Sequence, residues 1–390
     1  MTAGTTARRL GVGMVGHAFM GAAHSQAWRT AAHFFDLALT PELAVLCGRD
    51  ATRTRAAADR LGWRDTETDW KALLRRDDVA LVDICTPGDT HAEIAIAALD
   101  AGKHVLCEKP LANTVDEARA MAAAAERARE RGVHSMVGFN YRRVPAVALA
   151  RRLVADGRLG EIRHVRGTYL QDWVVDPQFP LVWRLRADRA GSGALGDIGA
   201  HAVDLAQFVV GDRLTGVTAL METFVRERPL PVAAGASGSA GRGQVTVDDA
   251  ALFLGRFSGG GLASFEATRF ATGRKNALRL EVNGSLGSLA FDFESMNELS
   301  FFDGADDPIA AGFRRILVTE PEHPYAGAWW PPGHGLGYEH TFTHEVADLV
   351  RDLAAGVDPT PSFADGLQVQ LVLDAVARSS AGGSGWEEIG

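Results

Sequence analysis

The sequence predicts an α/β protein of two domains: a doubly wound parallel sheet comes first, and an α/β domain with a large, mainly antiparallel open sheet follows. Three observations support this fold class. The chain of 390 residues is too long for a single domain built around one hydrophobic core. Short apolar strands alternate with helical patterns in the first third, and long strands separated by glycine turns dominate after Pro145. We therefore expect domains at residues 1–140 and 141–390.

The first domain follows the pattern of βαβ units. Strands are expected at Val12–Val15, Leu43–Cys47, Leu81–Cys85, Val105–Cys107 and Ser135–Val137, with helices at Ala51–Leu61, His91–Ala101 and Val115–Arg131. Since short apolar strands that alternate with helices form parallel sheets, helices should cover both faces.

The second domain opens with a helix and continues with hairpins. We expect a helix at Ala146–Asp156, strands at Ile162–Leu170, Val217–Val225, Ala250–Phe257, Gly261–Ala267, Ala277–Val282 and Ser288–Phe293, a surface loop at Pro229–Gly243, and final helices at His340–Ala355 and Phe363–Ser379. Because the outer face of such a sheet needs covering, the pattern predicts a homodimer or homotetramer packed through it.

Composition narrows the class of protein and its partners. The net charge of -9 gives no reason to expect nucleic acid or an anionic membrane as a partner, and no apolar run approaches the length of a membrane span. The first ten residues lack the apolar core of a secretion signal. Three cysteines without metal-ligand spacing indicate reduced thiols and a cytoplasmic location.

Two glycine patterns overlap near the first strand. Gly11, Gly13 and Gly16 form the literal G-x-G-x-x-G, but this pattern occupies the strand itself. A phosphate-binding turn must follow the strand, where the chain reads Gly16-His17-Ala18-Phe19-Met20-Gly21. The pattern predicts a Rossmann-type dinucleotide site whose pyrophosphate lies on Gly16–Gly21, with Gly16, Ala18, Phe19, Met20 and Gly21 as cofactor-binding residues.

The cofactor is NAD or NADP, and the second strand leaves the choice open. An acid at the strand end favours NAD, whereas an arginine favours the phosphate of NADP. Gly48 stands where the acid is expected, and Arg49 and Asp50 follow. All three are predicted cofactor-binding residues.

Polar residues follow the later strands of the parallel sheet, where ligands bind in this fold. Thr86, Pro87 and His91 follow one strand, and Glu108 and Lys109 end the next. We expect Lys109 to stabilise a developing alkoxide or assist proton removal, and Thr86 and Glu108 to contact cofactor. Contact of Pro87 and His91 with the cofactor is implied by the family resemblance described below. A salt-bridged structural lysine is the alternative.

Asp197 and His201 are four residues apart at the start of a predicted helix and so point to one face. Histidine is a natural acid or base near neutral pH, and Asp197 is suited to orient it or to hold a second hydroxyl. The pair could be half of a metal site, but the sequence offers no matching set of His, Glu or Cys ligands to complete it. Hydride transfer to nicotinamide needs no metal.

The segments "GHAFMG" with His24, "TPGDTH", "CEKP", "GFNYRR" and "GDIGAHAVD" resemble the glucose-fructose oxidoreductase/inositol dehydrogenase/rhizopine catabolism family. "NYRRVPAVALA", "RGTYLQDW", "GSGALGDIGAH" and "PSFADG" look more narrowly like its anhydrosugar dehydrogenases. The resemblance implies that Lys109, Asp197 and His201 are the catalytic group. Two positions depart from the family: Ala18 replaces the usual second glycine, and Gly88-Asp89 stands where asparagine is common.

Tyr169, Gln171 and Trp173 alternate along a strand and share one face. Aromatic faces and polar side chains suit a carbohydrate, although a subunit interface would use the same stripe. Further substrate-binding candidates are Asn140, Tyr141, Arg142, Trp183, Arg184 and His334.

These residues predict an NAD(P)-dependent oxidation of a secondary hydroxyl of a sugar, anhydrosugar or inositol to a ketone, or the reverse reaction. One alternative is a redox-neutral enzyme that uses transient oxidation by NAD to cleave a glycoside or eliminate a substituent. A catalytically silent nucleotide sensor is a second alternative, but it has no need of Lys109, Asp197 and His201 together.

Overall fold

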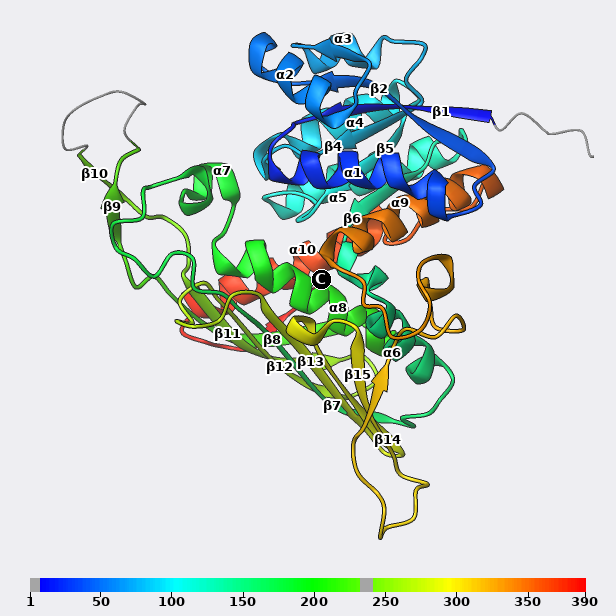
Figure 1. Ribbon diagram of the computed structural model, residues 1–390. Coiled ribbons are helices and arrows are strands. Elements are labelled where there is room, and N and C mark those ends of the chain that lie inside the picture. The colour runs from blue at the N-terminus through cyan, green and yellow to red at the C-terminus, as the bar shows by residue number, and fades with distance from the viewer. Residues whose placement is uncertain (1–7, 232–240) are drawn as a thin grey trace, which may run out of the picture.

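The computed structural model describes residues 8–231 and 241–390. The first domain contains a six-stranded parallel sheet in the order β3-β2-β1-β4-β5-β6 (Figure 1). Its strands are β1 (Arg8–Val15), β2 (Leu39–Cys47), β3 (Asp65–Glu67), β4 (Leu81–Ile84), β5 (His104–Glu108) and β6 (Ser135–Gly138). The order reverses between β1 and β4, which opens a crevice at the carboxyl ends of these strands.

Helices cover both faces of this sheet, as predicted. They are α1 (Phe19–Phe34), α2 (Ala51–Leu61), α3 (Trp70–Leu74), α4 (His91–Asp100) and α5 (Val115–Arg129). Buried residues of α1 and α2 belong to one hydrophobic cluster, and those of α4 and α5 belong to another. Strand β3 and helix α3 were missed by the sequence analysis because each spans too few residues to show a period.

The second domain contains a nine-stranded sheet in the order β16-β15-β14-β13-β7-β12-β11-β8-β17. Its strands are β7 (Ile162–Leu170), β8 (Leu214–Glu222), β11 (Ala250–Phe257), β12 (Leu262–Thr268), β13 (Ala277–Gly284), β14 (Gly287–Asp292), β15 (Glu298–Asp303), β16 (Arg314–Leu317) and β17 (Glu387–Glu388). Only the pair β7–β12 is parallel among these described strands. The predicted fold class is therefore confirmed.

Two predicted boundaries in this domain need correction. Strand β8 ends at Glu222, so residues 223–225 of the predicted strand lie beyond it. The surface loop expected at Pro229–Gly243 begins and ends in a two-stranded sheet, β9 (Glu227–Pro229) and β10 (Arg242–Gln244). The central part of that loop, residues 232–240, lies outside the described residues.

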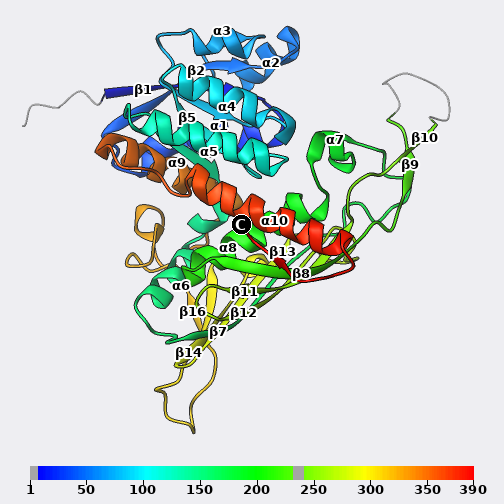
Figure 2. The same cartoon turned by 180° about the vertical axis from the view of Figure 1, so that it is seen from behind.

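The remaining helices are α6 (Pro145–Ala155), α7 (Ala187–Ala190), α8 (Ala200–Val210), α9 (Tyr338–Ala355) and α10 (Phe363–Ala381). Helices α8 and α10 lie on the same side of the nine-stranded sheet (Figure 2). Helix α9 instead packs against α1, where Phe342 and Val346 join Trp28 in one buried cluster. The core of the first domain thus includes side chains far beyond residue 140.

No helix in the described parts of the chain is both long and apolar enough to cross a membrane.

Candidate active site

A cavity of about 610 Å³ lies between the carboxyl ends of β4 and β5 and the second domain. The predicted site residues that line it are Ala18, Phe19, Met20, Thr86, Pro87, His91, Glu108, Lys109, Asn140, Tyr141, Tyr169, Gln171, Trp183, Arg184, Asp197 and His201. Residues from separate motifs therefore meet in one cavity, which is large enough for a small ligand beside part of a cofactor.

The turn between β1 and α1 has the geometry of a phosphate loop. Gly16 has a φ of 98°, and a Cβ on it would lie 2.7 Å from the carbonyl oxygen of Cys85. A Cβ on Gly21 would overlap the carbonyl oxygen of Gly16. Ala18 has a φ of -75°, a value that alanine tolerates. Because no side chain caps the start of α1 and its first turn has no acid, its backbone N–H groups suit an anion such as pyrophosphate.

The first glycine pattern has a structural use. Gly11 and Gly13 lie within β1, where a Cβ on Gly11 would overlap the carbonyl oxygen of Asp78. A Cβ on Gly13 would lie 2.9 Å from a methyl carbon of Leu73. These glycines permit close packing within the domain, which supports the prediction that Gly16–Gly21 holds the cofactor.

Replacing Gly21 by alanine is expected to weaken NADH binding by about tenfold or more, because overpacking at the start of α1 costs ~1–3 kcal/mol and shifts the N–H groups. Titration of NADH by fluorescence tests this. Ala32→Gly on the exposed side of α1 is the control, since it weakens the helix without touching the turn. Unchanged NADH affinity in Gly21→Ala would contradict this location of the pyrophosphate.

The segment that follows β2 carries the three residues expected to meet the adenosine ribose. Asp50 caps α2 by accepting a hydrogen bond from the backbone N–H of Arg53, and Arg49 is exposed. His17 lies over Gly48, where a Cβ would lie 2.5 Å from the Nε2 atom of His17. His17 was missed by the sequence analysis. The choice between NAD and NADP stays open.

His91 joins the segments that follow β4 and β5. Its Nε2 lies 2.8 Å from the carbonyl oxygen of Thr86, and its Nδ1 lies 3.1 Å from that of Pro110. The ring is 1% exposed. His91 therefore fixes the backbone that carries Pro87 and Lys109.

Lys109, Asp197 and His201 come together although they lie on different elements. The Nζ of Lys109 donates to the backbone oxygen of Asp197 at 2.7 Å and lies 3.8 Å from its carboxylate. Burial alone would raise the pKa of Asp197, but Lys109, Arg269 and Arg184 lower it. Asp197 is thus held as a carboxylate beside a cation.

His201 is suited to accept a proton. Burial and the nearby Lys109 lower the pKa of His201 well below its ordinary value, so the ring is neutral at neutral pH. Its Nδ1 atom is buried and has no hydrogen-bond partner among the described residues. The ring packs on Tyr141, with centroids 4.4 Å apart, which fixes its orientation.

Asp197 lies in a π-helical turn, Leu195–Gly199, that precedes α8. The sequence analysis expected an ordinary helix start here. Two backbone N–H groups, of Gly193 and Leu195, donate to the carboxylate of Asp248 at 2.6 and 2.7 Å. A buried acid from the segment that precedes β11 therefore holds the wide turn that carries Asp197.

Three predicted substrate residues are not among the described residues that line the cavity. Arg142 forms an ion pair with Asp204, which is 2% exposed. Trp173 packs edge-on against the ring of Phe179. His334 is exposed, and its Nδ1 lies 2.8 Å from a carbonyl oxygen of its own turn. Trp173 also donates a hydrogen bond to Gln171, which does line the cavity. Contact of these three side chains with the substrate stays a prediction.

The cavity also contains residues that the sequence analysis missed. They are Asn113, Ser192, Arg269, Asn276, Phe293 and Tyr338. Asn276 accepts hydrogen bonds from Tyr169 at 2.7 Å and Gln171 at 2.8 Å, and the side chain of Arg269 lies 3.5 Å from the carboxylate of Asp197. Asn113 and Ser192 lie close in sequence to Lys109 and Asp197. The other four come from distant parts of the chain, so no local motif connects them to the site.

Beneath the cavity, His24 lies between two buried carboxylates. Its Nδ1 is 3.0 Å from Asp83, and its Nε2 is 2.9 Å from Glu108. Burial alone would lower the pKa of His24, but the Asp83 carboxylate raises it well above its ordinary value. Glu108 also accepts a hydrogen bond from the backbone N–H of Lys109 at 3.1 Å. The charged His24 ring thus stabilises the carboxylate that holds the Lys109 backbone.

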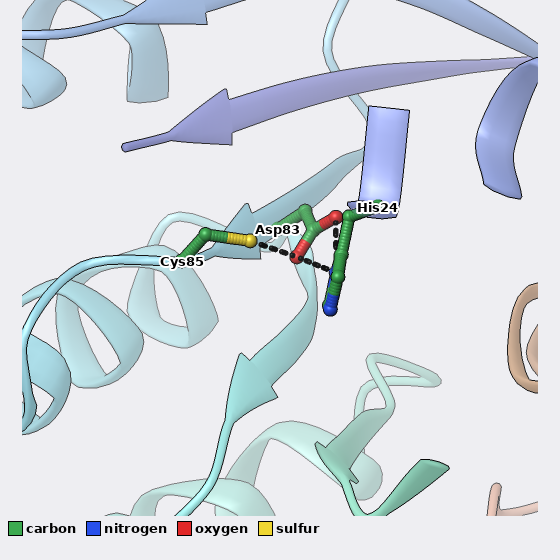
Figure 3. A group of neighbouring side chains, drawn as sticks. All are labelled: His24, Asp83 and Cys85. Carbon is green, nitrogen blue, oxygen red and sulfur yellow. Dashed lines mark hydrogen bonds and ion pairs between the residues drawn. The ribbon is translucent and has the colours of Figure 1, made fainter. Parts of the chain in front are cut away.

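Figure 3 shows His24 and Asp83 side by side, with Cys85 next to them. Within residues 8–231 and 241–390, these three form the one group whose ligand atoms lie close enough together for a metal ion. Both ring nitrogens of His24 already lie at hydrogen-bond distance from carboxylates, however. The contacts therefore describe a buried hydrogen-bonded network, and we assign no metal to it.

The parallel sheet with its phosphate loop, together with the lysine, aspartate and histidine in one cavity, defines a nucleotide-dependent oxidoreductase. Residues 10–139 match the family model described as the oxidoreductase family with an NAD-binding Rossmann fold, and residues 147–290 match the GFO/IDH/MocA C-terminal domain. The chain belongs to the Gfo/Idh/MocA family of NAD-binding oxidoreductases, as the sequence motifs predicted.

Among its relatives, levoglucosan dehydrogenase from Pseudarthrobacter phenanthrenivorans is 43% identical over 96% of this chain and 97% of its own. A crystal structure of an oxidoreductase domain protein from Kribbella flavida is 68% identical, with a TM-score of 0.95 over 98% of this chain and 100% of that one. The structure of levoglucosan dehydrogenase in complex with NADH and levoglucosan is 42% identical, with a TM-score of 0.92. The match covers 98% of this chain and 100% of that one. The narrower resemblance to anhydrosugar dehydrogenases is thereby confirmed.

Proposed function

We propose that the protein is an NAD(P)-dependent dehydrogenase that oxidises a secondary hydroxyl of a cyclic sugar, an anhydrosugar of the levoglucosan type or an inositol to a ketone, or catalyses the reverse. The observation that carries this proposal is the meeting of Lys109, Asp197 and His201 in a cavity that also reaches the phosphate loop. The likeness to levoglucosan dehydrogenase supports an anhydrosugar as the first substrate to test.

The nicotinamide cofactor, when bound, supplies the hydride acceptor for oxidation. The residues at the start of α1 would hold its phosphates, and those after β4 and β5 would lie beside its nicotinamide half. The open N–H groups of the first turn, and the tight turn and close packing that Gly16 and Gly21 permit, fit this cofactor.

In this proposal His201 accepts the hydroxyl proton, since a neutral imidazole ring carries one nitrogen without a proton, as a base requires. Lys109 donates a hydrogen bond to the same oxygen and stabilises its developing negative charge. Asp197 keeps Lys109 in place and accepts a hydrogen bond from a neighbouring hydroxyl of the substrate. Lys109 as the base is the alternative assignment.

The side of the cavity that faces the strand ends has side chains suited to a carbohydrate substrate. Tyr141 and Tyr169 present aromatic rings, and Gln171, Asn276 and Arg184 provide polar groups on the same cavity. Flat aromatic faces pack against the C–H groups of a sugar ring while polar side chains bind its hydroxyls.

A screen of cyclic sugars, anhydrosugars and inositols with NAD⁺ and NADP⁺ tests the proposed activity. We expect at least one of these polyols to give net NADH or NADPH, followed by absorbance, with a ketone as the product. Turnover of a glycoside without any net reduced cofactor would favour the redox-neutral alternative, and binding of cofactor without turnover of any polyol would favour the sensor.

We also propose that two or four copies associate through the outer face of the nine-stranded sheet. Four leucines on adjacent strands, Leu220, Leu252, Leu254 and Leu262, are 49–65% exposed there. An apolar patch of this kind marks a protein interface. Light scattering is expected to give a dimer or tetramer, and Leu252→Glu with Leu254→Glu should shift it towards the monomer. A wild-type mass near 41.6 kDa would contradict the proposal.

Cys47, Cys85 and Cys107 are buried and unpaired in the described residues. Free buried thiols support a reducing compartment, and we propose the cytoplasm as the location.

A further inference from the structure

One stretch of the second domain, residues 183–192, carries α7 and forms part of the cavity surface; we call it the wall segment. Four of its residues line the cavity: Trp183, Arg184, Ala190 and Ser192. Helix α7 stands out from the large sheet towards the first domain (Figure 1). A shift of the wall segment would therefore move side chains that face the substrate.

Apolar packing attaches the wall segment to the second domain alone. Leu185 belongs to a small hydrophobic cluster with Val174, Leu181, Val245 and Val247, which is separate from the two main clusters. All five residues lie in the second domain. In the part of the chain that the structure describes, no hydrophobic cluster joins the wall segment to the first domain.

Polar contacts attach the wall segment to the first domain instead. The Nε of Arg189, in α7, lies 2.8 Å from a carboxylate oxygen of Asp89, which lies in the turn after β4. The Nδ2 of Asn113, four residues after Lys109, donates a hydrogen bond to the backbone oxygen of Arg189 at 3.0 Å. Both contacts meet at Arg189, and they come from the segments that carry Pro87 and Lys109.

The ion pair acts on the cavity from outside it. Neither Asp89 nor Arg189 is among the described residues that line the cavity. Their side chains are 21% and 41% exposed, so solvent and salt reach the pair. A contact of this kind can position the wall segment, and it is weak enough to break and re-form.

We propose that Asp89 and Arg189 form a latch that positions the wall segment against the strand ends of the first domain. The latch holds Trp183 and Arg184 where they bind the sugar beside the cofactor. Asp89 and Arg189 are positioning residues, since they act through the wall segment and not by contact with the substrate. This inference rests on the proposed function, because it concerns how the same cavity binds its sugar.

Asp89→Asn and Arg189→Gln each remove one charge of the latch with little change in volume. Each should raise the KM of the sugar about two- to fivefold, the range for a partly exposed ion pair, with kcat and NADH affinity unchanged. The double variant should raise KM no further than either single variant, because both substitutions break one contact. In the wild type, KM should rise towards the value of the variants in ~0.5 M salt, which screens the pair.

Asp188→Asn is the matched control. Asp188 lies in the same helix, but its partner is Arg186 of the wall segment itself, at 2.8 Å. The substitution makes the same change of charge without touching the contact with the first domain. It should leave KM and its salt dependence at the wild-type level.

Hydrogen exchange followed by mass spectrometry tests the latch without any sugar. The backbone amides of residues 183–192 should exchange faster in Asp89→Asn than in the wild type or in Asp188→Asn, while those of β4 should not. If the wild type turns over no polyol, the proposed function fails, and the exchange rates still decide the latch. Unchanged exchange in the wall segment, an unchanged KM, additive effects in the double variant, or the same effects in Asp188→Asn would each overturn the proposal.

Discussion

Replacing Lys109 or His201 by alanine is expected to lower kcat by about 10²–10⁴-fold, the usual cost of losing a positioned acid or base. NADH binding should survive, because neither residue belongs to the phosphate loop. Loss of one ground-state hydrogen bond would cost far less, so the size of the effect separates a catalytic role from a binding role. Steady-state rates on a verified substrate, measured beside NADH titrations, provide the comparison.

The pH dependence adds a second test of His201. A base must be neutral to accept a proton, and burial and Lys109 lower the pKa of His201. The neutral, active form of His201 should therefore persist below pH ~6.5, the ordinary pKa of histidine. On the acid side, kcat/KM should begin to fall only below that pH. Lys71→Ala and His33→Ala, at exposed positions, are the controls. Near wild-type kcat in either active-site variant would refute the role assigned to that residue.

His24→Gln is expected to lower the free energy of unfolding by about 3–5 kcal/mol, the range for removing one partner of a buried ion pair. Asp83 and Glu108 would then remain buried without the cation that lies between them. Chemical denaturation of both proteins gives the difference. His33→Gln, on the exposed side of the same helix, is the control and should change stability by less than ~0.5 kcal/mol.

The effect of His24 should depend on pH in a definite direction. Since the folded-state pKa of His24 is raised, its contribution is fully present below the unfolded pKa of ~6.5 and declines as pH rises towards the folded value. The difference between wild type and His24→Gln should therefore shrink at alkaline pH. A difference that grows with pH, or a variant as stable as wild type, would show that His24 is not held as a cation.

The sequence predicted most strands of both sheets from their apolar or alternating patterns, but it missed β3, β15, β16 and β17. Strand ends and a glycine-rich helix start are local signals, so the sequence marked Lys109 and His201 separately, and the family resemblance grouped them in one site. The ion pair of Arg142 with Asp204 could not be predicted, because the two residues are distant in sequence and only the fold brings them together. Arg269 was missed for the same reason. The π-helical turn at Asp197 depends on Asp248, an acid just before β11 that no local pattern connects to it.

The position of α9 on the first domain has a consequence for how the chain folds during synthesis. The ribosome completes β1 and α1 early, but the side chains that cover them, Phe342 and Val346, emerge only after the strands β7 to β16 of the large sheet. Until then Trp28 and its neighbours on α1 lack their cover, and exposed apolar surface of this kind favours aggregation. The nascent first domain should therefore be a chaperone client until α9 docks, even though its own strands and helices can already form.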